Sequence, residues 1–217
     1  MLGTLALNDN DPAQAADWFK QSLTLCEQLN DKRLIAQRWG NVGLALYLQR
    51  QFEAAQDCYQ RSITLFIEAQ DDVQRAVMQM NLGNLYLVST QPDKALELYT
   101  LAEPPLNRAH DSLHLAMIDL NRGIAKRQLH EWQQAEQLLQ KSIVGWEKLG
   151  DIVMLGKTLY QLGLLYYDQK AMVKAQTIFQ GALKRLDEIQ PDPARDALYK
   201  KITSRLQGMD TEPSSAA

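Results

Sequence analysis

Apolar residues along this chain recur three and four positions apart, which is the spacing of one face of an α-helix. Residues 71–87 show this spacing, residues 89–93 form a short polar turn, and Ala95, Tyr99 and Ala102 begin a second apolar stripe. No segment shows the strict alternation that is typical of a β-strand. The pattern therefore predicts an all-α protein built from pairs of helices.

The helical pairs repeat with a period of 40 residues. Each unit has a glycine, an alanine twelve positions later, a large apolar residue four further on and a small residue three beyond that. The four columns are Gly3, Gly43, Gly83, Gly123 and Gly163; Ala15, Ala55, Ala95, Ala135 and Ala175; Phe19, Tyr59, Tyr99, Leu139 and Phe179; and Ser22, Ser62, Ala102, Ser142 and Ala182. One helical hairpin cannot bury its apolar faces alone, so the hairpins must stack. The sequence predicts an α-solenoid of five units over residues 1–190.

The repeated residues resemble a known family. The spacing W-x2-L-G-x2-Y…A-x3-F is the signature of the tetratricopeptide repeat. It is matched by Trp39, Val42, Gly43, Leu46, Ala55 and Tyr59, by Leu82, Gly83, Tyr86, Ala95 and Tyr99, and by Leu162, Gly163, Tyr166, Ala175 and Phe179. The 40-residue period resembles the long-repeat branch with kinesin light chain, the LGN/Pins scaffolds and bacterial MalT-type or peptide-sensing regulators. The resemblance implies a right-handed superhelix whose leading helices line a concave groove.

The two ends of the array differ from its middle. Little sequence precedes Gly3, so we expect the first unit to have only about half of its leading helix. Such an edge suits a piece of a longer protein, a partner or a second copy. Residues 191–207 read as a polar helix that caps the last unit, as repeat arrays require. Residues 208–217 have the composition of a disordered tail.

Composition and charge narrow the classes of partner. The 217 residues are 46% hydrophobic and 23% charged with a net charge of −3, which is typical of a soluble folded protein. That charge favours no nucleic-acid partner, and no apolar run reaches the ~18 residues that a membrane span needs. Two cysteines without a C-x-x-C pair fit a reducing compartment. We therefore expect a cytoplasmic protein without nucleic-acid or membrane partners.

No group of residues suggests catalysis. His110 and His114 are four apart, but no third metal ligand lies near them in sequence. The stretch Gly156-Lys157-Thr158 looks like the end of a phosphate-binding loop, yet Asp151 stands where its first glycine should be, and the stretch lies inside a predicted helix. We expect no enzyme, metal or cofactor.

Asparagine or glutamine recurs two positions before the repeated glycine, at Asn41, Asn81, Asn121 and Gln161. In the family this position faces the concave groove. A primary amide offers one acceptor and two donors, which match a peptide C=O and N–H together. One amide per repeat could therefore hold an extended backbone, with each bond worth about 0.5–1.5 kcal/mol. The alternative, that these amides bond to the adjacent helix and set the stacking, stays open.

We predict a non-enzymatic interaction module that binds a peptide or protein segment in the groove. The backbone of the ligand would be held by Asn41, Asn81, Asn84, Asn121 and Gln161, and its side chains by Tyr47, Met80, Leu120, Arg127, Lys157, Tyr160 and Tyr167. The few groove charges, Arg127 and Lys157 against Asp168, suggest at most a mildly acidic ligand. Two alternatives are the sensor or regulatory part of a larger signalling protein and a structural module that assembles with itself through the incomplete first repeat.

Overall fold

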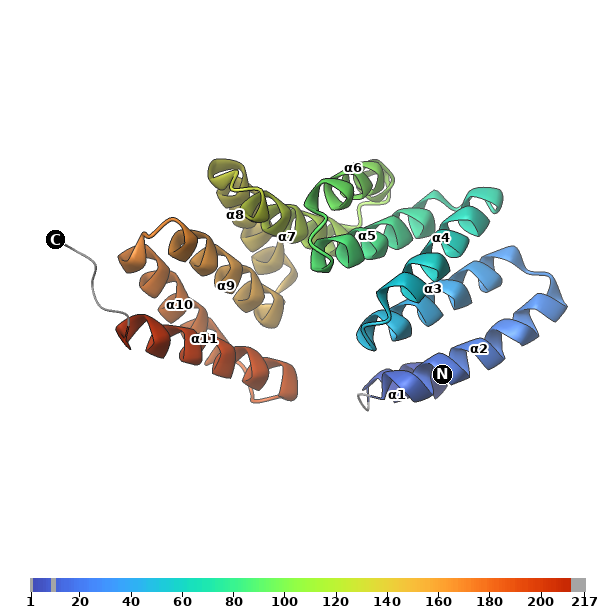
Figure 1. Ribbon diagram of the computed structural model, residues 1–217, viewed down its shortest axis with the longest axis horizontal. Coiled ribbons are helices and arrows are strands. Elements are labelled where there is room, and N and C mark those ends of the chain that lie inside the picture. Colours follow the sequence, from blue (N-terminus) through green and yellow to red (C-terminus); the bar gives the residue numbers. More distant parts are fainter. Residues whose placement is uncertain (1, 9–10, 212–217) are drawn as a thin grey trace. The chain divides into compact units, whose positions relative to one another are not determined.

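The protein is described by a computed structural model over residues 2–8 and 11–211 (Figure 1). Every regular element in these ranges is an α-helix. The helices are α1 (Leu2–Asn8), α2 (Pro12–Leu29), α3 (Lys32–Leu48), α4 (Phe52–Glu68), α5 (Asp72–Val88), α6 (Pro92–Arg108), α7 (Ser112–Gln128), α8 (Trp132–Leu149), α9 (Ile152–Asp168), α10 (Met172–Leu186) and α11 (Pro193–Thr211). The predicted all-α solenoid class is confirmed.

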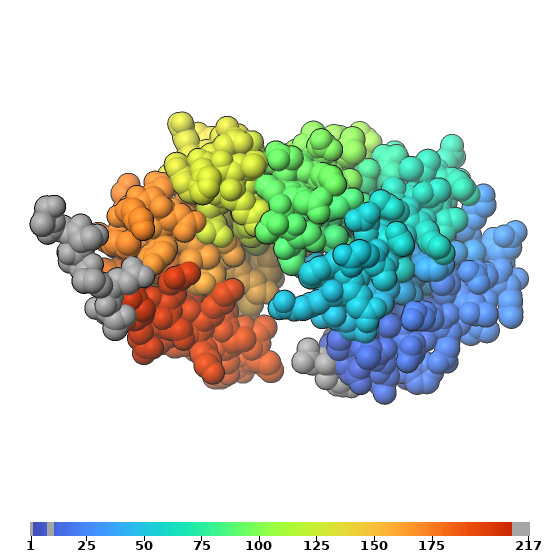
Figure 2. Space-filling view, viewed as in Figure 1, coloured from blue at the N-terminus to red at the C-terminus, as the bar shows by residue number. Residues whose placement is uncertain are grey.

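The chain divides into two compact units. The N-terminal unit, residues 1–111, holds α1–α6, and the C-terminal unit, residues 112–217, holds α7–α11. Within each unit consecutive helices pack as antiparallel hairpins, and each hairpin packs on the next. In the C-terminal unit α11 packs on both α9 and α10, and it is the red helix beside the orange ones in Figure 2.

The repeated glycine and the large apolar residue sixteen positions later are in contact in each hairpin. A Cβ added at Gly83 would lie 2.6 Å from Cε1 of Tyr99, and one added at Gly123 would lie 2.7 Å from Cγ of Leu139. The alanines of the second column, Ala95 among them, are fully buried. The small residues thus allow the two helices of a hairpin to approach closely.

Short polar side chains join the two helices within a hairpin, α4 to α3 and α8 to α7. The hydroxyl of Ser62 donates to the carbonyl oxygen of Ala36 at 2.7 Å, and that of Ser142 donates to the carbonyl of Ala116 at 2.9 Å. Both hydroxyls are buried, so each needs the partner that it has. These bonds explain why serine recurs in the column of small residues.

The eight turns from that between α2 and α3 to that between α9 and α10 share one backbone conformation. The residues with positive φ angles are spaced twenty apart, at Asn30, Arg50, Gln70, Thr90, His110, His130, Gly150 and Lys170. The N–H group of the following residue donates to a carbonyl group near the end of the preceding helix. At the end of α4, for example, Asp71 N–H donates to the carbonyl of Phe66 at 2.9 Å. The left-handed conformation thus lets N–H groups of the turn bond to carbonyl groups that the end of a helix leaves unpaired. Asp31, Asp71 and Asp151 cap the helices that follow three of these turns. At Asp151, for example, Oδ1 accepts from the Met154 amide at 2.9 Å.

The terminal helices differ from the others. The first, α1, has 7 residues, whereas α3 and α5 each have 17. The last, α11, buries Leu198, Ile202 and Met209 in the core cluster of the C-terminal unit. It continues to Thr211, so residues 208–211, which we assigned to a tail, are helical. The rest of the predicted tail lies outside the described residues.

Candidate functional site

The predicted groove positions all lie on leading helices. Asn41 and Tyr47 are on α3; Met80, Asn81 and Asn84 on α5; Leu120, Asn121 and Arg127 on α7; and Lys157, Tyr160, Gln161 and Tyr167 on α9. The first two helices belong to the N-terminal unit and the last two to the C-terminal unit. The site is therefore described for each unit separately.

In the N-terminal unit the predicted residues are in different environments. Asn41, Asn81 and Tyr47 are half-buried. The hydroxyl of Tyr99 donates to Oδ1 of Asn84 at 2.9 Å, so this amide joins α6 to α5 within one hairpin. Burial raises the pKa of Tyr99 well above its usual value, which keeps the hydroxyl protonated as a donor. At Asn84, therefore, the amide contributes to packing.

Met80 is 1% exposed. A side chain with almost no exposed surface has nothing to present to a ligand, so a direct contact at Met80 has no support in this structure. Methionine is flexible and fills irregular gaps between helices. Its place in the predicted groove column therefore does not make it a specificity residue.

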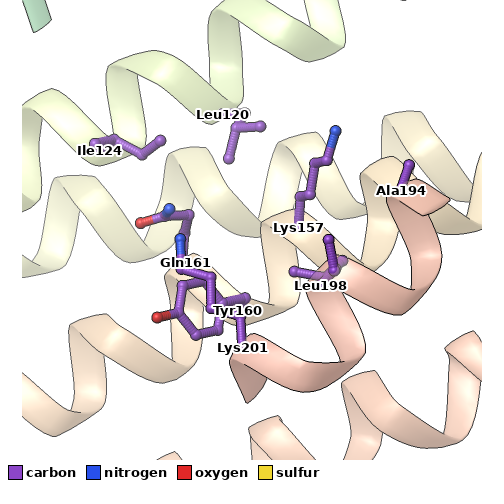
Figure 3. Close-up of a pocket in the computed structure, with 9 residues that line it drawn as sticks. Leu120, Ile124, Lys157, Tyr160, Gln161, Ala194, Leu198 and Lys201 are labelled. Carbon is purple, nitrogen blue, oxygen red and sulfur yellow. The ribbon is translucent and has the colours of Figure 1, made fainter. Parts of the chain in front are cut away.

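In the C-terminal unit four predicted residues come together around one cavity. Leu120 on α7 and Lys157, Tyr160 and Gln161 on α9 line a space of about 500 Å³ (Figure 3). Its other lining residues are Ile124 on α7 and Ala194, Ala197, Leu198 and Lys201 on α11. A volume of this size suits a ligand segment of a few residues or a small molecule.

The cavity combines an apolar wall with a few polar groups. Leu120, Ile124 and Leu198 supply the apolar surface. Oε1 of Gln161 is buried, and no described residue donates a hydrogen bond to it. An unpaired buried acceptor is unfavourable, and the Gln161 amide would have to rotate before a ligand N–H could reach this oxygen. The ammonium of Lys201 lies 4.8 Å from the centre of the Tyr160 ring, and Lys157 is exposed.

A second, smaller hollow lies between α9 and α11, beside the first cavity. It measures about 300 Å³ and shares Tyr160 and Lys201 with the first cavity. Its remaining lining residues are Tyr167, Ser204, Arg205, Gly208 and Met209. The guanidinium of Arg205 lies 4.8 Å from the centre of the Tyr167 ring. A cation stacked on an aromatic ring therefore occurs twice along the boundary of α9 and α11.

Two predicted residues of this unit, Asn121 and Arg127, line neither hollow. Nη1 of Arg127 is 2.7 Å from Oδ2 of Asp168, so an ion pair between α7 and α9 balances this guanidinium. Asn121 is half-buried on α7 and does not line the cavity. Of the repeated amides Asn41, Asn81, Asn121 and Gln161, only Gln161 is among the residues that line this cavity.

The sequence analysis missed the contribution of α11. We treated this helix as a polar cap, yet it forms one wall of the cavity. The signal was present in the sequence, since Ala194, Ala197, Leu198, Lys201 and Arg205 are three and four positions apart and so share one helix face. Only the packing of α11 against α9 shows that this face meets the predicted groove residues.

The metal-binding and phosphate-binding candidates of the sequence form no such site among the described residues. Among the described residues no group of three His, Cys, Asp or Glu side chains could hold a metal ion. The phosphate-loop look-alike lies inside α9, and the Thr158 hydroxyl donates to the carbonyl of Met154 at 2.9 Å. No helix in the described part of the chain is both long and apolar enough to cross a membrane.

Comparisons with known proteins agree with this fold. Residues 34–104, which include most of α3, all of α4 and α5 and most of α6, match the model of the tetratricopeptide repeat. Over this stretch the chain is therefore similar to the tetratricopeptide repeat family. The repeated Gly-Ala-aromatic spacing continues beyond it, through the hairpin of α9 and α10. A search of the curated proteins finds no match.

Solved structures with tetratricopeptide-like repeats share the architecture. A putative kinesin light chain from Podosopora anserina has a TM-score of 0.68 and 13% identity, covering 86% of this chain and 92% of its own. A Rap protein in complex with competence and sporulation factor has a TM-score of 0.79 and 14% identity, over 96% and 62%. A signal-transduction ATPase with a tetratricopeptide repeat sensor, from Pyrococcus horikoshii, has a TM-score of 0.72 and 13% identity, over 97% and 32%. At these identities the likeness concerns the fold.

Proposed function

We propose that this chain is a non-catalytic module that binds a peptide or protein segment along its leading helices. The observation that carries the proposal is the cavity between α7, α9 and α11, where Leu120, Lys157, Tyr160 and Gln161 converge. The repeat register, together with the groove that the family resemblance implies, predicted these residues. Their gathering around one hollow favours a shared binding role. The fold likeness to a Rap protein that binds competence and sporulation factor supports the same class of function.

The mechanism follows from the donors and acceptors of the site. The half-buried side-chain amides of Asn41, Asn81, Asn121 and Gln161 would bond to the ligand backbone. The apolar wall of the cavity would take one side chain, which gives specificity. Each hydrogen bond adds about 0.5–1.5 kcal/mol, so several are needed together with apolar burial.

A pull-down from the source lysate tests the proposal. We expect partners that bind the wild-type chain to be lost with Asn41→Ala/Asn81→Ala/Asn121→Ala/Gln161→Ala. The matched control, Gln60→Ala/Gln137→Ala/Gln180→Ala, removes exposed amides from trailing helices and should keep the same partners. Mass spectrometry identifies the proteins, and circular dichroism checks that all three chains are equally helical.

Two outcomes would count against the groove. If the four-amide variant keeps all partners, binding takes place on another surface. If that variant unfolds while the control does not, the amides set the stacking of the helices, as Asn84 already does through Tyr99.

A sensor role within a larger protein is the second candidate. The chain covers 32% of the ATPase that carries a tetratricopeptide repeat sensor and 62% of the Rap chain. In such a protein the repeat array would bind the signal and another domain would respond. The reading frame that surrounds this sequence tests the idea, because a sensor requires an effector domain on the same chain or on a stable partner.

A further inference from the structure

Two cations of α11, Lys201 and Arg205, are held against aromatic rings and not by an acidic partner among the described residues. Tyr160 supports the ammonium of Lys201, and Tyr167 supports the guanidinium of Arg205, each at 4.8 Å from the ring centre. An aromatic face attracts a cation and fixes its position, but it carries no net charge to cancel it. The tyrosines thus position two positive charges along the boundary of α9 and α11.

The described surface around these cations is basic. Among the described residues no Asp or Glu lines either hollow, whereas Lys157, Lys201 and Arg205 all do. The acidic residue at the C-terminal end of α9, Asp168, is paired with Arg127 at 2.7 Å. The two hollows therefore form a continuous positive strip in a chain whose net charge is −3.

The strip lies beside an apolar wall. Leu120, Ile124 and Leu198 line the larger hollow, and Lys157 and Lys201 line the same space. In Figure 3 Lys157 and Lys201 project from two different helices, with the apolar side chains between and beside them. A ligand that fits must offer an apolar side chain and negative charge within the same few residues.

We propose that α11 makes the C-terminal unit selective for an acidic peptide segment with an apolar anchor residue. The anchor fills the cavity between α7, α9 and α11, and neighbouring carboxylates bond to Lys157, Lys201 and Arg205. This inference rests on the proposed function and adds the chemical class of the ligand. It assigns the charge preference to the helix that follows the repeats.

Fluorescence anisotropy with short labelled peptides tests the proposal. The acidic probe is Gly-Ser-Glu-Asp-Leu-Glu-Leu-Gly with an amidated C-terminus. The neutral probe replaces Glu by Gln and Asp by Asn, and a third probe is the neutral peptide with a free C-terminal carboxylate. We expect the acidic probe to bind about fivefold to tenfold more tightly than the neutral one, because a few exposed ion pairs each add a small gain. Added salt should reduce this difference.

Matched variants assign the preference to residues. In Lys201→Gln/Arg205→Gln the acidic and neutral probes should bind within about twofold of each other. The control Lys200→Gln removes an exposed charge from the adjacent position of α11, which lines neither of these two hollows, and should keep the full preference. Lys201→Arg/Arg205→Lys keeps both charges and should also keep it. Circular dichroism confirms the helix content of each chain.

The outcomes separate this inference from the proposed function. Equal binding of acidic and neutral probes, no binding of any probe at about 1 mM, or a preference that survives Lys201→Gln/Arg205→Gln would each overturn the inference. The proposed function would still be supported in each of these cases if the four-amide variant loses its partners in the lysate experiment. Tightest binding of the probe with the free chain end would overturn the assignment to acidic side chains and point to terminal carboxylates.

Discussion

At the scale of single residues, the turns are the most regular feature of this chain. Eight residues twenty positions apart adopt positive φ angles, and Gly150 is the only glycine among them. A side chain in the left-handed region costs about 1–2 kcal/mol, so seven turns carry this strain and one does not. In these turns, N–H groups donate hydrogen bonds to carbonyl groups of the preceding helix, and these bonds offset part of the strain.

Gly150 and Gly181 give a matched test of this argument. A Cβ added at either position meets no atom within 4 Å, but Gly150 has φ of +70° and Gly181 lies inside α10. We expect Gly150→Ala to destabilise the protein by about 1 kcal/mol and Gly181→Ala to stabilise it by about 0.5–1 kcal/mol. Urea denaturation followed by circular dichroism measures both.

The two substitutions add the same methyl group, so each serves as the control for the other. A loss of stability for both would mean that the methyl group itself is harmful. Equal stability for both would remove the backbone argument.

At the scale of elements, α11 has two roles. Its apolar face packs into the core cluster of the C-terminal unit, and its neighbouring residues form a wall of the cavity. Ile202 is fully buried, and Lys201 beside it stacks on Tyr160. The packing of α11 and the shape of the cavity therefore depend on the same few residues.

Ile202→Ala tests how firmly this helix is anchored. Removing a fully buried isoleucine side chain costs about 2–5 kcal/mol, from lost burial and from the remaining cavity. We expect a loss in this range and weaker binding of the peptide probes at temperatures where the unit is still folded. Thermal denaturation and anisotropy give the two readings.

Val173→Ala is the control for that substitution. Val173 is 77% exposed on α10, so its truncation should change stability by less than about 0.5 kcal/mol. A small effect for Ile202→Ala as well would show that α11 contributes little to the core.

At the scale of the whole molecule, buried tyrosines link stability to alkaline pH. Desolvation raises the pKa of Tyr59 and of Tyr99 well above the usual value near 10. Both rings fill the space beside a repeated glycine, so the contact that defines the hairpin also buries an ionisable group. The Tyr166 pKa is raised to about 12 by desolvation and by its hydrogen bond to Glu136.

The sign of the pH effect follows from these shifts. Below about pH 10 the phenols are protonated in both states, and stability is unaffected by them. Above that pH the unfolded chain loses these protons while the folded chain keeps them. Stability should therefore fall by about 1.4 kcal/mol per pH unit for each such tyrosine, until the folded pKa is reached.

Urea midpoints measured between pH 8 and pH 11 test this prediction. Tyr59→Phe removes one titrating group while keeping the ring, so the decline above pH 10 should be less steep. Absorbance near 295 nm follows the ionisation directly. An unchanged slope in Tyr59→Phe would show that this phenol is not protected in the folded protein.

The sequence by itself determined the fold class and the 40-residue register, which sets Gly83 sixteen positions before Tyr99 and Gly163 sixteen before Phe179. These features repeat in every unit, and local steric rules fix them. It could not determine which groove positions are accessible, because exposure depends on neighbouring helices, as the burial of Met80 and the bond from Tyr99 to Asn84 show. Only the tertiary structure brought Lys201 to Tyr160 and Arg205 to Tyr167, since α11 lies outside the repeat and its docking follows from packing rather than from period.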